Sequence, residues 1–141
     1  MNKRQLLAQT TTDPVILDKL SKDENYYVRL YVATNPNTSP ETLDYLSKDE
    51  NSSVRCVVAL NQNTAPETFD KLSKDENYYV RCRVAENFNT TPETLKQMSI
   101  DIDEKNYWLK YYIKNNPNCP LETWKYLSAL ELLESLSEVS T

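Results

Sequence analysis

Basic side chains recur along this sequence at a fixed spacing. Arg29, Arg55 and Arg81 lie 26 residues apart, and Lys110 is the next member of the series. A row of like charges at regular intervals could bind the phosphates of a nucleic acid, and Arg83 would add to it. The alternative is a structural role, in which each guanidinium pairs with an acid or with carbonyl groups at a helix end, and we expect this role. The partners would come from acidic pairs that recur nearby: Asp23-Glu24, Asp49-Glu50 and Asp75-Glu76.

The same acidic pairs permit another hypothesis. A ridge of carboxylates could imitate the phosphates of nucleic acid, so that the chain would act as an inhibitor in the basic groove of another protein. A lysine precedes each pair, however, at Lys22, Lys48 and Lys74, and partly cancels its charge. The net charge of −5 also disfavours nucleic acid as a partner, because phosphate binding needs a clustered positive surface.

Residues that commonly carry catalysis are missing. The chain has no histidine for general-base work and no glycine for a phosphate-binding loop. Its three cysteines are an odd number without a secretory signal, which predicts reduced thiols rather than a disulfide framework. The chain has no Cys-x-x-Cys pair and no histidine, so a metal site of Cys and His is not expected. We therefore expect a chain that is not an enzyme and that carries no cofactor and no metal.

The expected location is the cytoplasm, without a membrane partner. No apolar run approaches the ~20 residues that a bilayer span requires. The first residues, from Met1 to Leu7, lack the apolar core of a signal peptide.

An internal repeat organises the chain. Pro14, Pro40, Pro66 and Pro92 share a period of 26, and a fifth copy with Leu121 in the proline position follows an insertion near residues 100–102. Each copy predicts a short first helix that begins at the proline, a polar turn, and a second short helix. At about two turns, the first helix could be α or 3₁₀. The expected first helices are 14–21, 40–47, 66–73, 92–99 and 121–128, and the second helices are 26–34, 52–60, 78–86 and 107–115.

These elements predict an all-α fold, a short α-solenoid of about five repeats without a β-sheet, since two short helices bury their apolar faces only by stacking on neighbours. The chain would be a single domain, 1–141, with a partial helix at 1–8, repeats at 9–128 and a capping helix at 129–141. We expect one apolar face to seal the last repeat through Leu127, Leu130, Leu133 and Leu136.

An asparagine ends each second helix, at Asn35, Asn61, Asn87 and Asn116. Asparagine tolerates the left-handed conformation better than other residues with a side chain. The sequence therefore predicts left-handed asparagine caps, which would let the chain turn without glycine.

The repeat resembles the leucine-rich repeat variant, a bacterial helical repeat. The residues that carry the resemblance are Val54-Arg55, Val58-Ala59, Asn61, Thr64 to Phe69 and Lys71 to Asp75. The resemblance covers the chain from about Gln9 to Ser128. It implies a superhelix of alternating α and 3₁₀ helices and a scaffold with little chemistry. One member holds an iron–sulfur cluster on cysteines ahead of its repeats, and this chain lacks that cysteine cluster. The copy with Leu109-Lys110 and Lys114 departs from the pattern.

Comparison of the copies separates two arcs of the second helix. The positions of Val28, Arg29, Val32 and Ala33 barely change between copies, which indicates the inward arc. The opposite arc varies and is rich in aromatic residues, which are typical of protein contacts when they are exposed. We call its candidate binding residues the aromatic stripe: Tyr27, Tyr31, Leu60, Tyr79, Arg83, Trp108, Tyr111 and Tyr112.

The leading hypothesis is a non-enzymatic scaffold that binds a partner protein through the aromatic stripe. One alternative is that the stripe packs between adjacent repeats or against the terminal helix, and another is that it joins copies of this chain into a homo-oligomer. A third is that the basic ladder of Arg29, Arg55, Arg81 and Lys110 binds nucleic acid.

Overall fold

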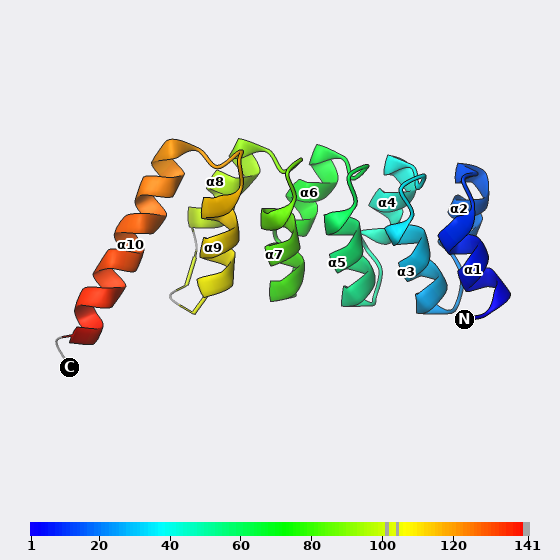
Figure 1. Ribbon diagram of the computed structural model, residues 1–141, viewed down its shortest axis with the longest axis horizontal. Helices are drawn as coiled ribbons and strands as arrows, with labels where there is room; N and C mark the ends of the chain where they lie inside the picture. The colour runs from blue at the N-terminus through cyan, green and yellow to red at the C-terminus, as the bar shows by residue number, and fades with distance from the viewer. Residues whose placement is uncertain (101, 104, 140–141) are drawn as a thin grey trace.

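The computed structural model describes residues 1–100, 102–103 and 105–139. Within these ranges the regular elements are all helices, which confirms the predicted all-α repeat architecture. The helices form two rows (Figure 1). One row contains α1 (Lys3–Thr10), α3 (Tyr26–Thr34), α5 (Ser52–Leu60), α7 (Tyr78–Glu86) and α9 (Tyr107–Asn115). The other contains α2 (Pro14–Leu20), α4 (Pro40–Leu46), α6 (Pro66–Leu72), α8 (Pro92–Ile100) and the start of α10 (Leu121–Val139).

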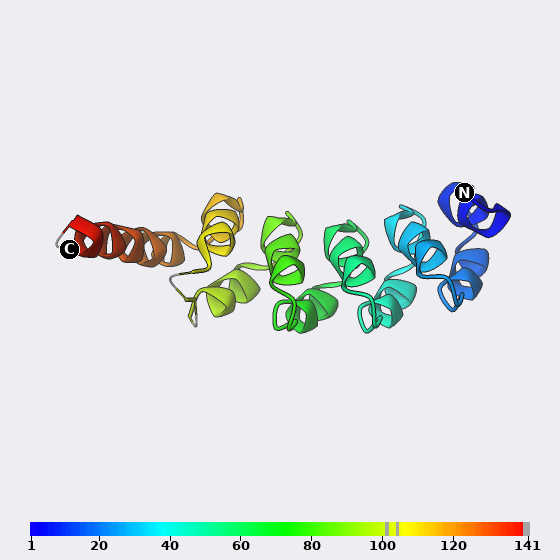
Figure 2. The same cartoon turned by 90° about the horizontal axis from the view of Figure 1, so that it is seen from below.

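The row from α1 to α9 forms the continuous part of the stack. Each of its helices packs on the next along the row. Figure 2 shows this row on the inner side of a shallow arc. The core lies between the rows, where Val54, Val58 and Ala59 of α5 are fully buried beside their counterparts in the neighbouring repeats. The invariant arc is therefore the inward one, as predicted.

The first helices are α-helical rather than 3₁₀, and most of them stop at a serine. Ser47, for example, ends α4 and donates its hydroxyl to the Asp44 carbonyl oxygen at 2.6 Å. The fifth copy differs, because Ala129 and Leu130 follow Ser128 in place of the polar turn residues. As a result α10 continues to Val139 without the expected boundary between repeat and cap.

The start of α6 has a weaker cap than the starts of α4 and α8. The Ser39 hydroxyl accepts the Thr42 N–H at 3.2 Å, and the Thr91 hydroxyl accepts the Thr94 N–H at 3.2 Å. Ala65 occupies the same position before α6 and has no side-chain acceptor.

We expect Ala65→Ser to raise the free energy of unfolding by about 1 kcal/mol, because a serine there supplies the missing acceptor. Urea denaturation of the variant and the unchanged chain measures this. Thr91→Ala is the reciprocal control and should lose a similar amount. An Ala65→Ser midpoint at or below that of the unchanged chain would contradict the capping argument.

The prediction of left-handed asparagine caps is wrong. Asn61 has φ −73° and ψ 131°, and Asn35 and Asn87 have the same extended conformation. None of the described residues has a positive φ. The turns after these second helices need no glycine because the chain leaves through extended backbone, which any residue can adopt.

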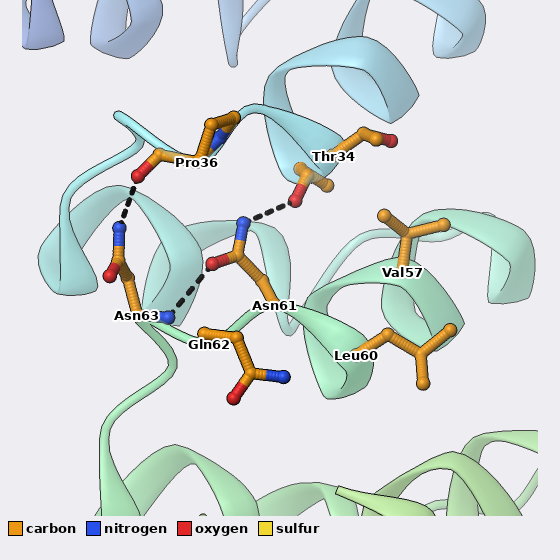
Figure 3. A pocket seen from close by; sticks show the side chains of 8 residues that line it. Thr34, Pro36, Val57, Leu60, Asn61, Gln62 and Asn63 are labelled. Atoms are coloured by element: carbon orange, nitrogen blue, oxygen red, sulfur yellow. Dashed lines mark hydrogen bonds between the residues drawn. The ribbon is translucent and has the colours of Figure 1, made fainter.

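The asparagines act through their side chains instead. The Asn61 amide nitrogen donates to the Ala33 carbonyl at 2.7 Å and to the Asn35 carbonyl at 3.2 Å in the preceding repeat, while its oxygen accepts the Asn63 N–H at 2.9 Å (Figure 3). Asn87 and Asn116 repeat the interaction, one and two units further on. This asparagine ladder satisfies helix-end carbonyl groups that a short helix otherwise leaves without partners.

The last helix seals the stack over only part of its length. Leu127 is fully buried and Leu130 is partly buried against the last repeat. The expectation that Leu133 and Leu136 complete the seal is wrong, because both side chains are exposed. These leucines follow Leu127 at intervals of three residues, so at 100° per residue Leu133 and Leu136 turn away from the face of α10 that contacts the stack.

Candidate functional site

The basic ladder is tied into the fold at Arg29 and Arg55. Arg55 donates from Nε to Asp75 Oδ2 at 2.8 Å and from Nη2 to Asp75 Oδ1 at 3.0 Å, and its Nη1 donates to the Asp49 carbonyl at 2.8 Å. Arg29 makes the same contacts with Asp49 and with the Asp23 carbonyl. Both side chains are nearly buried. The predicted pairing with acids of the turns is thus present for these two residues.

The ion pairs fix the charge of the groups that form them. Burial alone would raise the pKa of Asp75, but the bonds from Arg55 and from the Asn77 N–H outweigh it and hold this pKa below its usual range. The hydrogen bond to Asp75 in turn raises the pKa of Arg55. Each arginine thus joins its own turn to the turn of the next repeat through a bidentate, charge-assisted contact.

Arg81 follows the pattern in part. Its Nη1 donates to the Asp75 carbonyl at 2.7 Å, and its guanidinium lies 5.6 Å from the centre of the Tyr78 ring. The insertion near residues 100–102 interrupts the acidic series after Asp75-Glu76, and Asp101 and Glu104 lie outside the described residues.

Lys110, the last residue of the basic ladder, pairs with an acid of α10 rather than with an acid of a turn. Its side chain is 2% exposed and forms an ion pair with Glu134 of α10. One turn later Lys114, which replaces the usual alanine, pairs with Glu131 at 2.6 Å and lies 5.2 Å from the Trp124 ring centre. The two departures from the repeat therefore fasten α10 to α9. The spacing of the lysines and of the glutamates by about one helical turn was a signal for this contact that the sequence reasoning missed.

The aromatic stripe is not one continuous surface. Tyr27, Leu60, Tyr79, Trp108 and Tyr111 are exposed, whereas Tyr31, Arg83 and Tyr112 are half-buried. Between the tyrosines of α3 and those of α7, the corresponding positions of α5 hold Ser53, Cys56 and Val57, of which the last two pack against the core. The alternative that this arc packs between repeats thus holds for part of it.

The structure brings five members of the stripe together on α7 and α9. They are Tyr79, Arg83, Trp108, Tyr111 and Tyr112, and we call them the aromatic cluster. The Trp108 ring centre lies 5.9 Å from that of Tyr111 and 6.4 Å from that of Tyr112. A pocket of about 180 Å³ opens between the two helices, lined by Tyr79, Arg83, Trp108 and Tyr112 of the cluster together with Tyr78 and Cys82. The cluster is thus an exposed aromatic surface with a shallow depression.

Contacts within and below the cluster hold it in place. The Tyr78 hydroxyl accepts the Leu109 N–H at 3.1 Å and so links the floor of the pocket to the first turn of α9. Burial raises the pKa of Tyr78 above its usual range. Arg83 pairs with Glu86 at 2.6 Å along the rim. Tyr107 is exposed beside Trp108 and was missed, because the comparison of copies assigned its repeat position to neither arc of the second helix.

Leu60 contributes to a second pocket rather than to the cluster. This pocket has a volume of about 330 Å³ and lies between the ends of α3 and α5 (Figure 3). Its lining is Ala33, Thr34, Pro36, Val57, Leu60, Asn61, Gln62 and Asn63. Asn63 crosses one side of it and donates its amide to the Pro36 carbonyl at 2.5 Å. The pocket thus follows from the spacing of two successive turns.

The three thiols are free, and burial raises the pKa of Cys56, Cys82 and Cys119. Across the described ranges, no group of His, Cys, Asp and Glu side chains is arranged to hold a metal ion. No helix in that part of the chain combines the length and the apolar character that a membrane span requires.

Comparison of the chain with protein-family models, with curated proteins and with solved structures gives no match. The resemblance to the leucine-rich repeat variant stays a prediction. Function must therefore be inferred from the geometry of this chain.

Proposed function

We propose that this chain is a non-enzymatic, cytoplasmic scaffold that binds a partner protein through the aromatic cluster on α7 and α9. The observation that carries the proposal is the exposure of large aromatic side chains on adjacent, mutually packed helices. Tyr79 is 68% and Trp108 is 56% exposed, and Tyr111 lies beside them. Exposed tyrosine and tryptophan clusters on a rigid backbone are typical of contact surfaces, because they bury much area at little entropic cost.

Nucleic acid is disfavoured as a partner because most side chains of the basic ladder are already paired within the chain. Asp49 and Asp75 occupy the guanidinium groups of Arg29 and Arg55, and Lys110 is buried against Glu134. A phosphate would have to displace these carboxylates.

The same ion pairs argue against the hypothesis that the chain is an acidic inhibitor. Asp49 and Asp75 of the proposed carboxylate ridge are already paired with arginines of this chain. Membership in the leucine-rich repeat variant family, and with it a bacterial source, is part of the proposal.

Capture from a bacterial lysate tests the proposal. The unchanged chain is compared with Tyr79→Ser/Trp108→Ser/Tyr111→Ser, whose fold is checked by circular dichroism. We expect the folded triple variant to lose at least about tenfold in partner retention, because aromatic hot spots contribute ~2 kcal/mol or more each.

Phe88→Ser is the matched control, because Phe88 is as exposed as Tyr79 but lies in the loop after α7, outside the cluster. It should retain the partner. Equal retention by the triple variant, or salt-sensitive retention of nucleic acid alone, would count against the proposal.

A further inference from the structure

The outer face of α10 is apolar and has no partner among the described residues. Leu132 and Leu136 are 62% and 60% exposed, and Ala129 and Val139 are exposed on the same side. At 100° per residue this side is opposite to the one that carries Leu127 and contacts the stack. Figure 2 shows the second half of α10 projecting past α9, which leaves room for another element beside it.

The spacing of these residues is specific to helix pairing. Ala129, Leu132, Leu136 and Val139 follow one another at intervals of three, four and three residues, which is the alternation of a and d positions in a coiled coil. Two helices pair through a seam with this alternation of positions. The face therefore fits a second helix with the same periodicity.

The borders of the seam favour a second copy of the same helix. Ser128 and Ser135 lie along one border, and Tyr126 and Leu133 lie along the other. None of these residues carries a charge at neutral pH, so two copies would meet without the repulsion that identical charges at such positions produce.

The acids of this helix that face the stack are already engaged there. Glu131 and Glu134 form ion pairs with Lys114 and Lys110 of α9, on the side opposite to the seam. Their negative charge is therefore directed away from a second copy.

We propose that α10 pairs antiparallel with α10 of a second copy of this chain. In this register Leu132 of each copy packs against Leu136 of the other, and the small Ala129 packs opposite the larger Val139. A parallel pair would place alanine against alanine and would bring the two stacks to the same end of the helix pair. The antiparallel pair matches small with large side chains and separates the stacks.

The affinity of the two copies for each other is expected to be low. The seam covers only about three helical turns, so the buried area is below the ~1,200 Å² at which stable interfaces begin. The dimer therefore forms in a concentration-dependent equilibrium, and it presents two aromatic clusters from one assembly.

Sedimentation equilibrium of the full chain over a range of concentrations tests the pairing. We expect the mass to rise from that of one chain towards that of two. Leu132→Glu/Leu136→Glu should remain a monomer at every concentration, with an unchanged circular dichroism spectrum, since glutamate is a good helix former. Val15→Glu, at an exposed position of α2, should dimerise like the unchanged chain.

Two further variants separate this surface from other modes of association. Tyr79→Ser/Trp108→Ser should still dimerise, because the aromatic cluster is not part of the seam. Leu132→Cys mixed with Leu136→Cys should form a disulfide-linked pair under a mild oxidant, more readily than either variant alone or the unchanged chain with its own three thiols.

Three results would overturn the proposal. The first is a monomer at the highest concentration of the unchanged chain. The second is a dimer that survives Leu132→Glu/Leu136→Glu or is lost in Tyr79→Ser/Trp108→Ser. The third is cross-linking of each cysteine variant with itself in preference to the mixture, which would indicate a parallel pair.

Discussion

Replacement of Arg55 by alanine is expected to lower the free energy of unfolding by about 3 kcal/mol, the largest loss that we predict for a single side chain. The variant leaves Asp75 nearly buried without its bidentate partner. It also removes the donor to the Asp49 carbonyl, so that the contact between two successive turns is lost. Urea denaturation followed by circular dichroism measures the change.

Arg83→Ala is the control for this prediction. Arg83 also forms an ion pair, with Glu86, but both side chains are more than a third exposed. Exposed pairs contribute about 0.2–1 kcal/mol, so this variant should lose far less. Losses of similar size in the two variants would mean that burial of the Arg55 pair adds nothing.

The loss in Arg55→Ala should depend on pH. The pKa of Asp75 is depressed in the folded chain, so the ion pair stabilises the fold above the unfolded pKa of about 3.9 and this contribution disappears as the pH falls through the folded pKa. We therefore expect the gap between the unchanged chain and Arg55→Ala to be full at neutral pH and to narrow in acid. A gap that is constant down to strongly acidic pH would contradict the assignment to this ion pair.

Replacement of Asn61 by alanine is expected to cost about 2–3 kcal/mol, because unsatisfied buried polar groups cost ~1–3 kcal/mol each. Asn61 is nearly buried. Its amide is the donor to the Ala33 carbonyl at the end of α3, and its oxygen accepts the Asn63 N–H. The variant leaves both backbone groups without these partners and opens the contact between two repeats.

Gln62→Ala is the control, since Gln62 is the exposed neighbour of Asn61. A surface change of this kind should stay within about 0.5 kcal/mol. The Asn61 variant should also unfold at a lower urea concentration. If both variants unfold at the same concentration, the asparagine ladder does not hold the repeats together.

The repeat itself could be predicted because its signals are local and occur several times. The four expected second helices agree with α3, α5, α7 and α9 at both ends. The proline starts and the Val-Ala inward arc were also correct. The pairing of Arg29 and Arg55 with turn acids followed from the position of the arginines beside invariant apolar residues.

Most of the features that failed depend on contacts between repeats. Asn61 was expected to work through its backbone, and only the position of the preceding repeat shows that its side chain reaches the Ala33 carbonyl. The seal by Leu133 failed for a different reason, because two steps of three residues turn the helix by 240° and place Leu133 on another face than Leu127. The aromatic stripe was expected to be one surface, but its residues are exposed in some repeats and partly buried in others. The neighbours of each residue, which the repeat pattern does not show, decide how deeply it is buried.

The two tryptophans of the chain provide the most direct test of the central claim, that the aromatic cluster is the binding surface. Trp108 belongs to the cluster, whereas Trp124 lies in the first turn of α10. Each gives one indole N–H signal in a nitrogen-15 NMR spectrum of the labelled chain, and the signals are assigned with Trp124→Phe. On titration with the captured partner, we predict that the Trp108 signal shifts or broadens while the Trp124 signal stays in place. A Trp108 signal that does not change while the partner binds would contradict the claim.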